Sequence, residues 1–461
     1  MNRKRTPKLN IRVTPARWVA FRTLQDFRKG QKFIDEILHD YADSSRLSRE
    51  DRALSHQLVY GVLRNLYRLD FWIDRMSSKG IGSLPESIVD ALRLGLFQLA
   101  FLDRIPAHAV VDESVRLCDA ISMGPIKGLV NAILRRFPGR RDALEADIER
   151  DPRQVAIQTS HPDWLIDWAN HLFGKDRAEA WLRHNNTPPR LHLAPITSHF
   201  PQAPTPSRSE REAKAIRRLL EAIGEGEAKT DGETVTWEGG LPVAELGVIR
   251  SGQAYVQDPA ARQAVKLLEP KPGETVYDLC SAPGGKTLQI ADLLESQGKL
   301  VSVDSNVNRL KQVSENLSRC GFDWVETVCR DLTRDWEEAN QSADAVLVDA
   351  PCTGLGTLRR KVDLRYRLKP SDVEELAKKG LSLLENASRL VRPGGRLVFS
   401  TCTLTLEENE ETVRRFLSKH SKEWNLVREI KSPAWLFSDT EDDQSEVETD
   451  GSYCALLSRA N

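Results

Sequence analysis

The sequence predicts a multidomain protein with an all-α amino-terminal domain, a small mixed α+β connecting domain and a doubly wound α/β carboxyl-terminal domain. Apolar residues recur at helical spacing through the first third of the chain. From residue 273 onward, buried strand-like runs alternate with amphipathic helices, the pattern of a parallel sheet with right-handed crossovers. We therefore expect domains at 1–153, 154–250 and 251–461.

Composition and charge exclude several classes of protein. The 461 residues are 40% hydrophobic and 29% charged with a formal net charge of −1, as in ordinary folded proteins. The most apolar stretch, 88–102, is interrupted by polar residues, and the basic start lacks the apolar core of a signal peptide. The seven cysteines form no CxxC pair. We expect a cytoplasmic, monomeric protein with no membrane contact, disulfide framework or bound metal.

The first half of the chain is predicted mostly helical. Helical spacing covers 17–37, 51–73 and 87–102, which indicates a bundle ending near Phe137. The connecting domain is expected to contain helices at 162–183 and 207–225 and short strands at 234–237 and 254–256.

The carboxyl-terminal domain is predicted from four buried strands, at 275–280, 299–304, 344–350 and 395–401. A further strand is expected at 325–329, and Ser371 with Glu374 predicts a capping box at the start of one helix. Ligands of such sheets bind beyond the carboxyl ends of the strands, so functional residues are sought there.

Small residues and acids follow these strands. The turn at 280–287, CSAPGGKT, permits close approach of a ligand but matches neither a Walker loop nor GxGxxG, so it favours a nucleotide-like ligand without a phosphate requirement or a plain turn. Asp304 lies where such folds place an acid for ribose hydroxyls. Asp331 and Asp349 are further acids at strand ends, and each could serve as a ligand contact or a helix cap.

Two cysteines also follow predicted strands. Cys352 and Cys402 are each expected at the carboxyl edge of the sheet, where they would face one crevice. A single cysteine is usually a small buried hydrophobe, but two in this context indicate covalent catalysis.

The motifs together resemble a known family. DLCSAPGGKT (278–287), DAPCTGLGTLRRKVD (349–363) and STCTLTLEENEE (400–411) resemble the RNA cytosine-C5 methyltransferases. Residues 92–115 and 128–137 are similar to the NusB-type helical RNA-binding domain of the bacterial RsmB (Sun/Fmu) 16S rRNA methyltransferases. The resemblance covers most of the chain and implies a NusB-like domain before a Rossmann-like methyltransferase domain.

This resemblance implies that S-adenosylmethionine is the methyl donor. Asp304 would hold its ribose, Asp331 would lie near its adenine, and Asp349 would also contact the pyrimidine edge of the target base. The residues implied to bind the donor or line its pocket are Cys280, Ser281, Ala282, Pro283, Gly284, Gly285, Lys286, Asp304, Asp331 and Asp349.

The resemblance also implies the chemistry. Cys402 is the nucleophile that adds to carbon 6 of a cytosine and makes carbon 5 enamine-like, whereas Cys352 assists release of the product. The substrate would be an unpaired or flipped cytosine in small-subunit ribosomal RNA. Six basic residues after Cys352 would contact phosphates, namely Arg359, Arg360, Lys361, Arg365, Arg367 and Lys369.

Departures from the family pattern and rival functions remain. The closing strand carries Asp450-Gly-Ser-Tyr-Cys454 where adjacent aromatics are usual, and the acidic segment 439–450 is interpreted as solvated. Enzymes that methylate amino groups carry an Asp/Asn-Pro-Pro-aromatic motif, which 349–352 lacks. The same chemistry on transfer RNA and a non-catalytic NusB-like RNA-binding factor are the remaining alternatives.

Overall fold

The computed structural model describes residues 13–199, 208–223, 228–238, 243–437 and 449–461. The chain forms two compact units, residues 1–187 with 365–367, and residues 188–364 with 368–461. The expected three-part division is therefore corrected, because 154–250 is not a unit of its own: its first part groups with the helical unit and its remainder with the second unit. Most of the acidic segment 439–450 lies outside the described residues.

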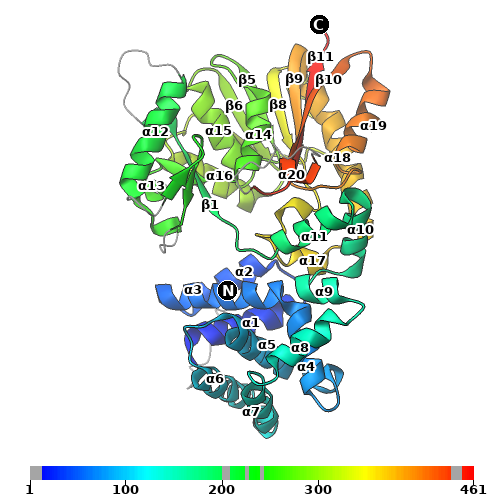
Figure 1. The fold of residues 1–461 in the computed structure, drawn as a ribbon. Coiled ribbons are helices and arrows are strands. Elements are labelled where there is room, and N and C mark those ends of the chain that lie inside the picture. Colours follow the sequence, from blue (N-terminus) through cyan, green and yellow to red (C-terminus); the bar gives the residue numbers. More distant parts are fainter. Residues whose placement is uncertain (1–12, 200–207, 224–227, 239–242, 438–448) are drawn as a thin grey trace, which may run out of the picture. The chain divides into compact units, whose positions relative to one another are not determined.

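The first unit is helical (Figure 1). Its elements are α1 Pro15–Phe27, α2 Ile34–Ser44, α3 Arg49–Arg64, α4 Leu66–Met76, η1 Ile81–Ser83, α5 Glu86–Phe101, α6 Ala107–Ala120, η2 Gly124–Ile126, α7 Lys127–Arg136, α8 Arg141–Glu149, α9 Gln154–Thr159, α10 Asp163–Phe173 and α11 Lys175–His184.

Three of the long helices predicted in this half are each divided in two. Gly30, between α1 and α2, has a φ of 71°, and Gly174, between α10 and α11, has a φ of 77°. A residue with positive φ cannot continue a right-handed helix, so the chain turns although the apolar spacing continues. The third break is at Asn65, between α3 and α4. The predicted helix at 87–102 is confirmed as α5.

A short segment distant in sequence completes the helical unit. Residues 365–367 lie at the end of α17 (Leu364–Arg367) and belong to this unit. The Arg365 guanidinium is fully buried and donates hydrogen bonds to the Thr159 and Asn185 carbonyl oxygens. The Tyr366 hydroxyl donates to the Ser160 carbonyl oxygen at 2.9 Å. These contacts are those of a packed core element.

The second unit contains a small antiparallel sheet of order β2-β3-β1-β4. The expected strands near 234–237 and 254–256 are confirmed as β3 and β4, and the helix at 207–225 as α12. The elements are β1 Leu191–Pro195, η3 Thr197–His199, α12 Arg208–Ile223, β2 Ala228–Thr230, β3 Val235–Trp237, η4 Val243–Glu245, α13 Gly247–Arg250 and β4 Ala254–Val256.

The larger sheet has the order β10-β11-β9-β8-β5-β6-β7 (Figure 1). The strands from β9 to β7 pair in parallel and β11 and β10 are antiparallel additions, so the expected doubly wound sheet is confirmed with a mixed edge. The chain passes from β5 to β6 and β7, then returns to the other side of β5 with β8, which makes the β5/β8 boundary the topological switch point.

The elements around this sheet closely follow the predicted alternation. They are α14 Pro259–Leu268, β5 Thr275–Leu279, α15 Gly285–Leu294, β6 Lys299–Asp304, α16 Val307–Arg319, β7 Glu326–Cys329, η5 Glu337–Ala339, β8 Ala343–Asp349, η6 Leu355–Thr357, α17, α18 Pro370–Leu390, β9 Val391–Thr401, α19 Glu410–His420, β10 Trp424–Ser432, α20 Ala434–Phe437 and β11 Ser452–Arg459.

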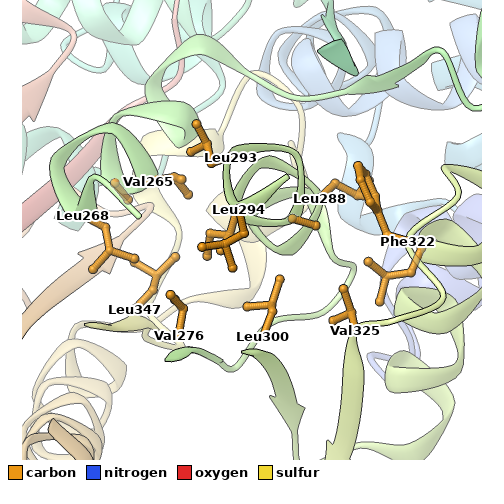
Figure 2. Packing of buried hydrophobic residues seen from close by; sticks show 14 of the residues in the cluster. Val265, Leu268, Val276, Leu288, Leu293, Leu294, Leu300, Phe322, Val325 and Leu347 are labelled. Carbon is orange, nitrogen blue, oxygen red and sulfur yellow. The ribbon is translucent and has the colours of Figure 1, made fainter. Parts of the chain in front are cut away.

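Hydrophobic cores cover both faces of the larger sheet. Successive residues of a strand point to opposite faces, so Val276 packs in one cluster and Tyr277 in the other. Figure 2 shows the first cluster, in which strand residues such as Leu300 face helix residues such as Leu294. Leu384 of α18 belongs to the second cluster. With both faces covered, only the strand ends are left for a site.

Two local expectations for this unit are corrected or confirmed. The helix α18 begins at Pro370 rather than Ser371, and the Lys369 N–H donates to the Asp372 carboxylate at 2.9 Å, so the predicted Ser371/Glu374 capping box is wrong. The closing strand forms as β11 without adjacent aromatics, because Tyr453 and Leu457 are buried in the second hydrophobic cluster.

Among the described residues, no helix combines the length and the apolar character needed to span a bilayer.

Packing of the central strand gives a stability prediction. Leu347 of β8 is fully buried, so Leu347→Ala should lower the free energy of unfolding of this unit by about 2–5 kcal/mol. Urea denaturation would measure it. The control is Leu426→Ala on β10, where the side chain is 39% exposed and the expected change is within about 0.5 kcal/mol. Equal effects of the two substitutions would contradict the assignment of β8 to the core.

Candidate active site

The two predicted cysteines meet at the carboxyl edge of the sheet. Asp349 at the end of β8 pairs with Ser400 near the end of β9, which brings the segments that follow to the same edge. The Cys352 and Cys402 sulfurs lie 3.4 Å apart, and the Cys402 N–H donates to the Cys352 sulfur at 3.3 Å. Parallel pairing of two strands thus brings together residues fifty positions apart in the chain.

The two thiols are electrostatically unequal. The pKa of Cys402 is lowered, first by the hydrogen bond from Cys352 and then by the positive charges of Lys361 and Lys286, against the opposing effects of burial and Asp349. The same hydrogen bond, with burial, raises the pKa of Cys352 well above its usual value. Cys402 is also exposed, whereas Cys352 is half-buried. The opposite shifts favour ionisation of Cys402 before Cys352.

A lysine–aspartate pair lies beside the cysteines. Lys286 Nζ and Asp349 Oδ2 are 2.7 Å apart. Burial alone would lower the pKa of Lys286, but the ion pair with Asp349 outweighs it and the pKa is raised, so the ammonium persists. The Ser400 hydroxyl donates to the other Asp349 oxygen at 3.3 Å. The positive charge of Lys286 therefore persists near Cys402, where it helps to lower the pKa of that thiol.

The glycine-containing turn is held against the neighbouring strand. The Ser281 N–H donates to the Val303 carbonyl oxygen at 3.0 Å, and the Ala282 N–H donates to Asp304 Oδ2 at 3.2 Å. Gly284 has a φ of 104°, and a Cβ there would lie 3.2 Å from a methyl group of Val313. The residues of this turn, which are expected to bind the methyl donor, are held rigidly. The backbone of the turn must approach helix α16 closely.

A cavity of about 520 Å³ opens beside this turn at the ends of the strands. Three of the residues predicted to bind the methyl donor line this cavity, namely Cys280, Asp304 and Asp331. Its volume is within the range of small-molecule sites, and an acid at the end of the second strand is where a ribose would be held. The sequence did not identify the other lining residues, which are Ser305, Arg309, Arg330, Leu332, Thr333, Pro351, Lys379 and Leu383.

The two acids of the cavity differ in their surroundings. Asp304 is buried and accepts hydrogen bonds from the Ala282 and Asn306 N–H groups. Asp331 is exposed and accepts from the Thr333 N–H and hydroxyl, which lower its pKa. Asp304 is therefore part of the framework of the turn, whereas Asp331 forms an open rim.

A buried glutamate connects the two cysteine segments, and its role was not identified from the sequence. Glu408 accepts hydrogen bonds from the Thr353 N–H at 2.7 Å, from the Thr353 hydroxyl at 2.6 Å and from the Thr405 hydroxyl at 2.7 Å. The Thr353 and Thr403 hydroxyls are also 2.7 Å apart. The only sequence signal was its place in the STCTLTLEENEE motif, because an exposed glutamate would look the same.

Of the six basic residues expected to contact phosphates, Arg365 is fully buried, which corrects the expectation for it, and Arg359, Arg360 and Lys361 have different surroundings. Arg359 is 4% exposed and donates to the Pro188 carbonyl oxygen at 2.8 Å, while Arg360 is paired with Asp258 and Asp450. The burial of Arg359 argues against its expected phosphate contact, whereas Arg360 is part-exposed and paired with two carboxylates, so its expected contact stays a prediction. Lys361 is exposed and remains available.

Comparisons with known proteins identify the family of the chain. A model of the family described as 16S rRNA methyltransferase RsmB/F matches residues 265–457, and a model of the NusB family matches residues 14–138. The probable ribosomal RNA small subunit methyltransferase B of Bacillus subtilis strain 168 is 32% identical over 413 residues, which cover 89% of this chain and 90% of the relative. The chain belongs to the RsmB/F methyltransferase family.

Other members and a solved structure extend the match. The ribosomal RNA small subunit methyltransferase B of Erwinia tasmaniensis is 30% identical over 412 residues, or 89% of this chain and 91% of the relative. The crystal structure of PH0851 has a TM-score of 0.74 at 23% identity and covers 96% of this chain and 99% of that one, a likeness of fold. The expected NusB domain and the expected Rossmann-like methyltransferase domain are thereby confirmed.

The unequal thiols predict unequal reactivity. A lowered pKa puts thiolate on Cys402 at a pH where Cys352 is still protonated, so iodoacetamide should alkylate Cys402 first and at lower pH. Peptide mass spectrometry across a pH series would measure both rates. Cys352→Ala removes the hydrogen-bond donor and should move the Cys402 profile to higher pH, whereas Cys352→Ser retains a donor and should move it less. Coincident profiles for the two cysteines would contradict the assignment.

Proposed function

We propose that the protein transfers a methyl group from S-adenosylmethionine to carbon 5 of a cytosine in small-subunit ribosomal RNA, through a covalent bond between Cys402 and carbon 6. The observation that carries this proposal is the pair of sulfurs 3.4 Å apart with oppositely shifted pKa values, beside the cavity assigned to the donor. If the two cysteines served only to pack the protein interior, neither would need to be exposed and readily ionised.

The chemistry explains why such a thiolate is required. Carbon 5 of cytosine is too weak a nucleophile to accept a methyl group unaided. Addition of the Cys402 sulfur to carbon 6 moves the electrons of the 5,6 double bond to carbon 5, which then accepts the methyl group. The methyl transfer leaves S-adenosylhomocysteine. Solvent water at the exposed site then takes the carbon 5 proton, and cleavage of the sulfur–carbon bond restores the double bond and the thiolate. In this series of steps, Cys352 lies beside the Cys402 sulfur, which must leave carbon 6.

The charges of the site support these steps. Lys286 and Lys361 stabilise the attacking thiolate and the same thiolate when it leaves. Asp349 holds Lys286 in place and is available to the pyrimidine edge of the base. Cys280, Asp304 and Asp331 would hold S-adenosylmethionine, which would supply an electrophilic methyl group. A stacked cytosine cannot reach the edge of the sheet, so the target is unpaired or flipped out of its helix.

The choice of ribosomal RNA rests on the relatives. The Bacillus subtilis and Erwinia tasmaniensis proteins carry small-subunit ribosomal RNA in their names and match both the helical and the catalytic parts of this chain. The same chemistry on transfer RNA and an RNA-binding factor without catalysis are the two rival outcomes.

The experiment uses purified protein, isotopically labelled S-adenosylmethionine and either small-subunit ribosomal RNA or transfer RNA, followed by mass spectrometry of the nucleosides. Label in 5-methylcytosine from ribosomal RNA is the expected result. Label in transfer RNA alone would overturn the substrate. Donor binding without labelling of naked RNA or of the small ribosomal subunit would favour the binding factor.

The roles of the two cysteines give a paired prediction. Cys402→Ala should abolish turnover while S-adenosylmethionine binding persists, because the cavity does not include Cys402. Cys352→Ala should accumulate a protein–RNA complex that survives denaturation, because its adduct is not released. A denaturing gel with labelled RNA would measure it. The double variant is the matched control and should form no complex. Normal turnover by Cys402→Ala would refute the nucleophile.

The exposed lysine gives a prediction about RNA binding. Lys361→Ala should reduce the slope of log affinity against log salt concentration by about one, because one phosphate contact is lost. Fluorescence anisotropy with the target RNA over a range of salt concentrations would measure the slope. An unchanged slope would remove Lys361 from the RNA-binding surface.

A further inference from the structure

Three charged residues from distant parts of the chain meet close to the cysteine loops. Arg360 Nη2 lies 2.7 Å from Asp258 Oδ2, and Arg360 Nε lies 2.6 Å from Asp450 Oδ2. The arginine side chain is 28% exposed and the two aspartates are 8% and 10% exposed. We call Arg360, Asp258 and Asp450 the arginine clamp.

The clamp is anchored at each end by the backbone. Asp258 caps helix α14, where its Oδ1 accepts from the Ala260 N–H at 2.9 Å. The same oxygen accepts from the Asp450 N–H at 3.1 Å. One carboxylate therefore holds the start of a helix, the residues before β11 and the segment that follows Cys352.

The residues beside the clamp contact the nucleophile's backbone directly. The Gly356 N–H donates to the Cys402 carbonyl oxygen at 3.0 Å, and the Gly451 N–H donates to the Gly356 carbonyl oxygen at 2.7 Å. A Cβ on Gly356 would lie 2.1 Å from the Gly451 carbonyl oxygen, so the two backbones are in full contact. Gly451 follows Asp450 in the chain, so a shift of Asp450 would be passed through Gly356 to Cys402.

We propose that Arg360 is a positioning residue for the methyl transfer: it holds together the segments whose backbone fixes Cys402 against Cys352. This inference rests on the proposed function. It takes the place of the phosphate contact expected from the sequence, because the Nε and Nη2 groups of the guanidinium already have carboxylate partners.

The two carboxylates explain why the arginine is needed. Burial, followed by the nearby charge of Asp258, raises the pKa of Asp450 to about 6 although the charge of Arg360 opposes both. Without the guanidinium, two largely buried carboxylates would face each other without compensation. Their separation would pull the segment before β11 away from Gly356.

The test compares four variants in the full chain. Arg360→Ala should lower kcat by about a hundredfold through misplacement of Cys402, while KM for RNA and Kd for S-adenosylmethionine change less than about twofold. Arg360→Lys retains the charge and should recover part of kcat. Asp450→Asn should lower kcat less than Arg360→Ala. Each loss of kcat should be accompanied by a shift of the Cys402 alkylation profile to higher pH, because misplacement of Cys402 weakens its hydrogen bond with Cys352.

Arg396→Ala is the matched control. Arg396 forms an ion pair with Glu274 at 2.7 Å, and the exposure of this pair is comparable to that of the Arg360 ion pairs. Arg396 lies away from the end of β9 that leads to Cys402. It should lower the melting temperature by an amount similar to Arg360→Ala and leave kcat and the alkylation profile unchanged. If Arg360→Ala does not fold, Arg360→Lys and Asp450→Asn carry the comparison.

Two outcomes would overturn the proposal. Raised KM for RNA and a flatter salt dependence with unchanged kcat would make Arg360 a phosphate contact. Unchanged kcat and an unchanged alkylation profile in stable variants would leave the clamp only structural. Alkylation and donor binding require no RNA, so they test the clamp even if the wild-type protein methylates neither RNA and the proposed function fails.

Discussion

The hydrogen bond between the two sulfurs is the interaction on which the rest of the site depends. It exists because β8 and β9 pair in parallel with Asp349 opposite Ser400, so the segments after both strands leave the sheet at the same edge. The hydrophobic clusters on the two faces fix that pairing. The geometry of the two cysteines at the edge is thus a consequence of packing within the sheet, and the contact between their sulfurs shifts their pKa values in opposite directions.

Charge in the second unit is arranged in pairs around this bond. The ammonium of Lys286 is available to Cys402 because Asp349 keeps it protonated despite its burial. Glu408 accepts hydrogen bonds from both Thr353 and Thr405 and so connects the two cysteine segments. The ion pairs of Arg360 connect the backbone segments around them. Buried ions are costly unless paired, so these partners restrict the segments to one arrangement.

Part of this could be predicted from the sequence, and the limits are physical. The strand at 299–304 and the meeting of Cys352 with Cys402 follow from buried apolar runs and from the rule that parallel strands end at one edge. Strand β10 was missed because most of its residues are exposed and it lacks a buried apolar run. The role of Arg360 could not be predicted, because a basic residue after a catalytic motif looks the same whether its partner is an RNA phosphate or an aspartate ninety residues away. The helix breaks at Gly30 and Gly174 depend on backbone conformation, which apolar spacing does not report.

The central claim is that the Cys402 sulfur bonds to carbon 6 of a cytosine. Its most direct test is to incubate the wild-type protein with S-adenosylmethionine and substrate RNA in which cytidine is replaced by 5-fluorocytidine, because fluorine at carbon 5 cannot leave as a proton does. The adduct would then be digested and mapped by mass spectrometry. The account predicts a donor-dependent covalent bond at Cys402. A bond at Cys352, or no adduct with an RNA whose unsubstituted form is methylated, would contradict it.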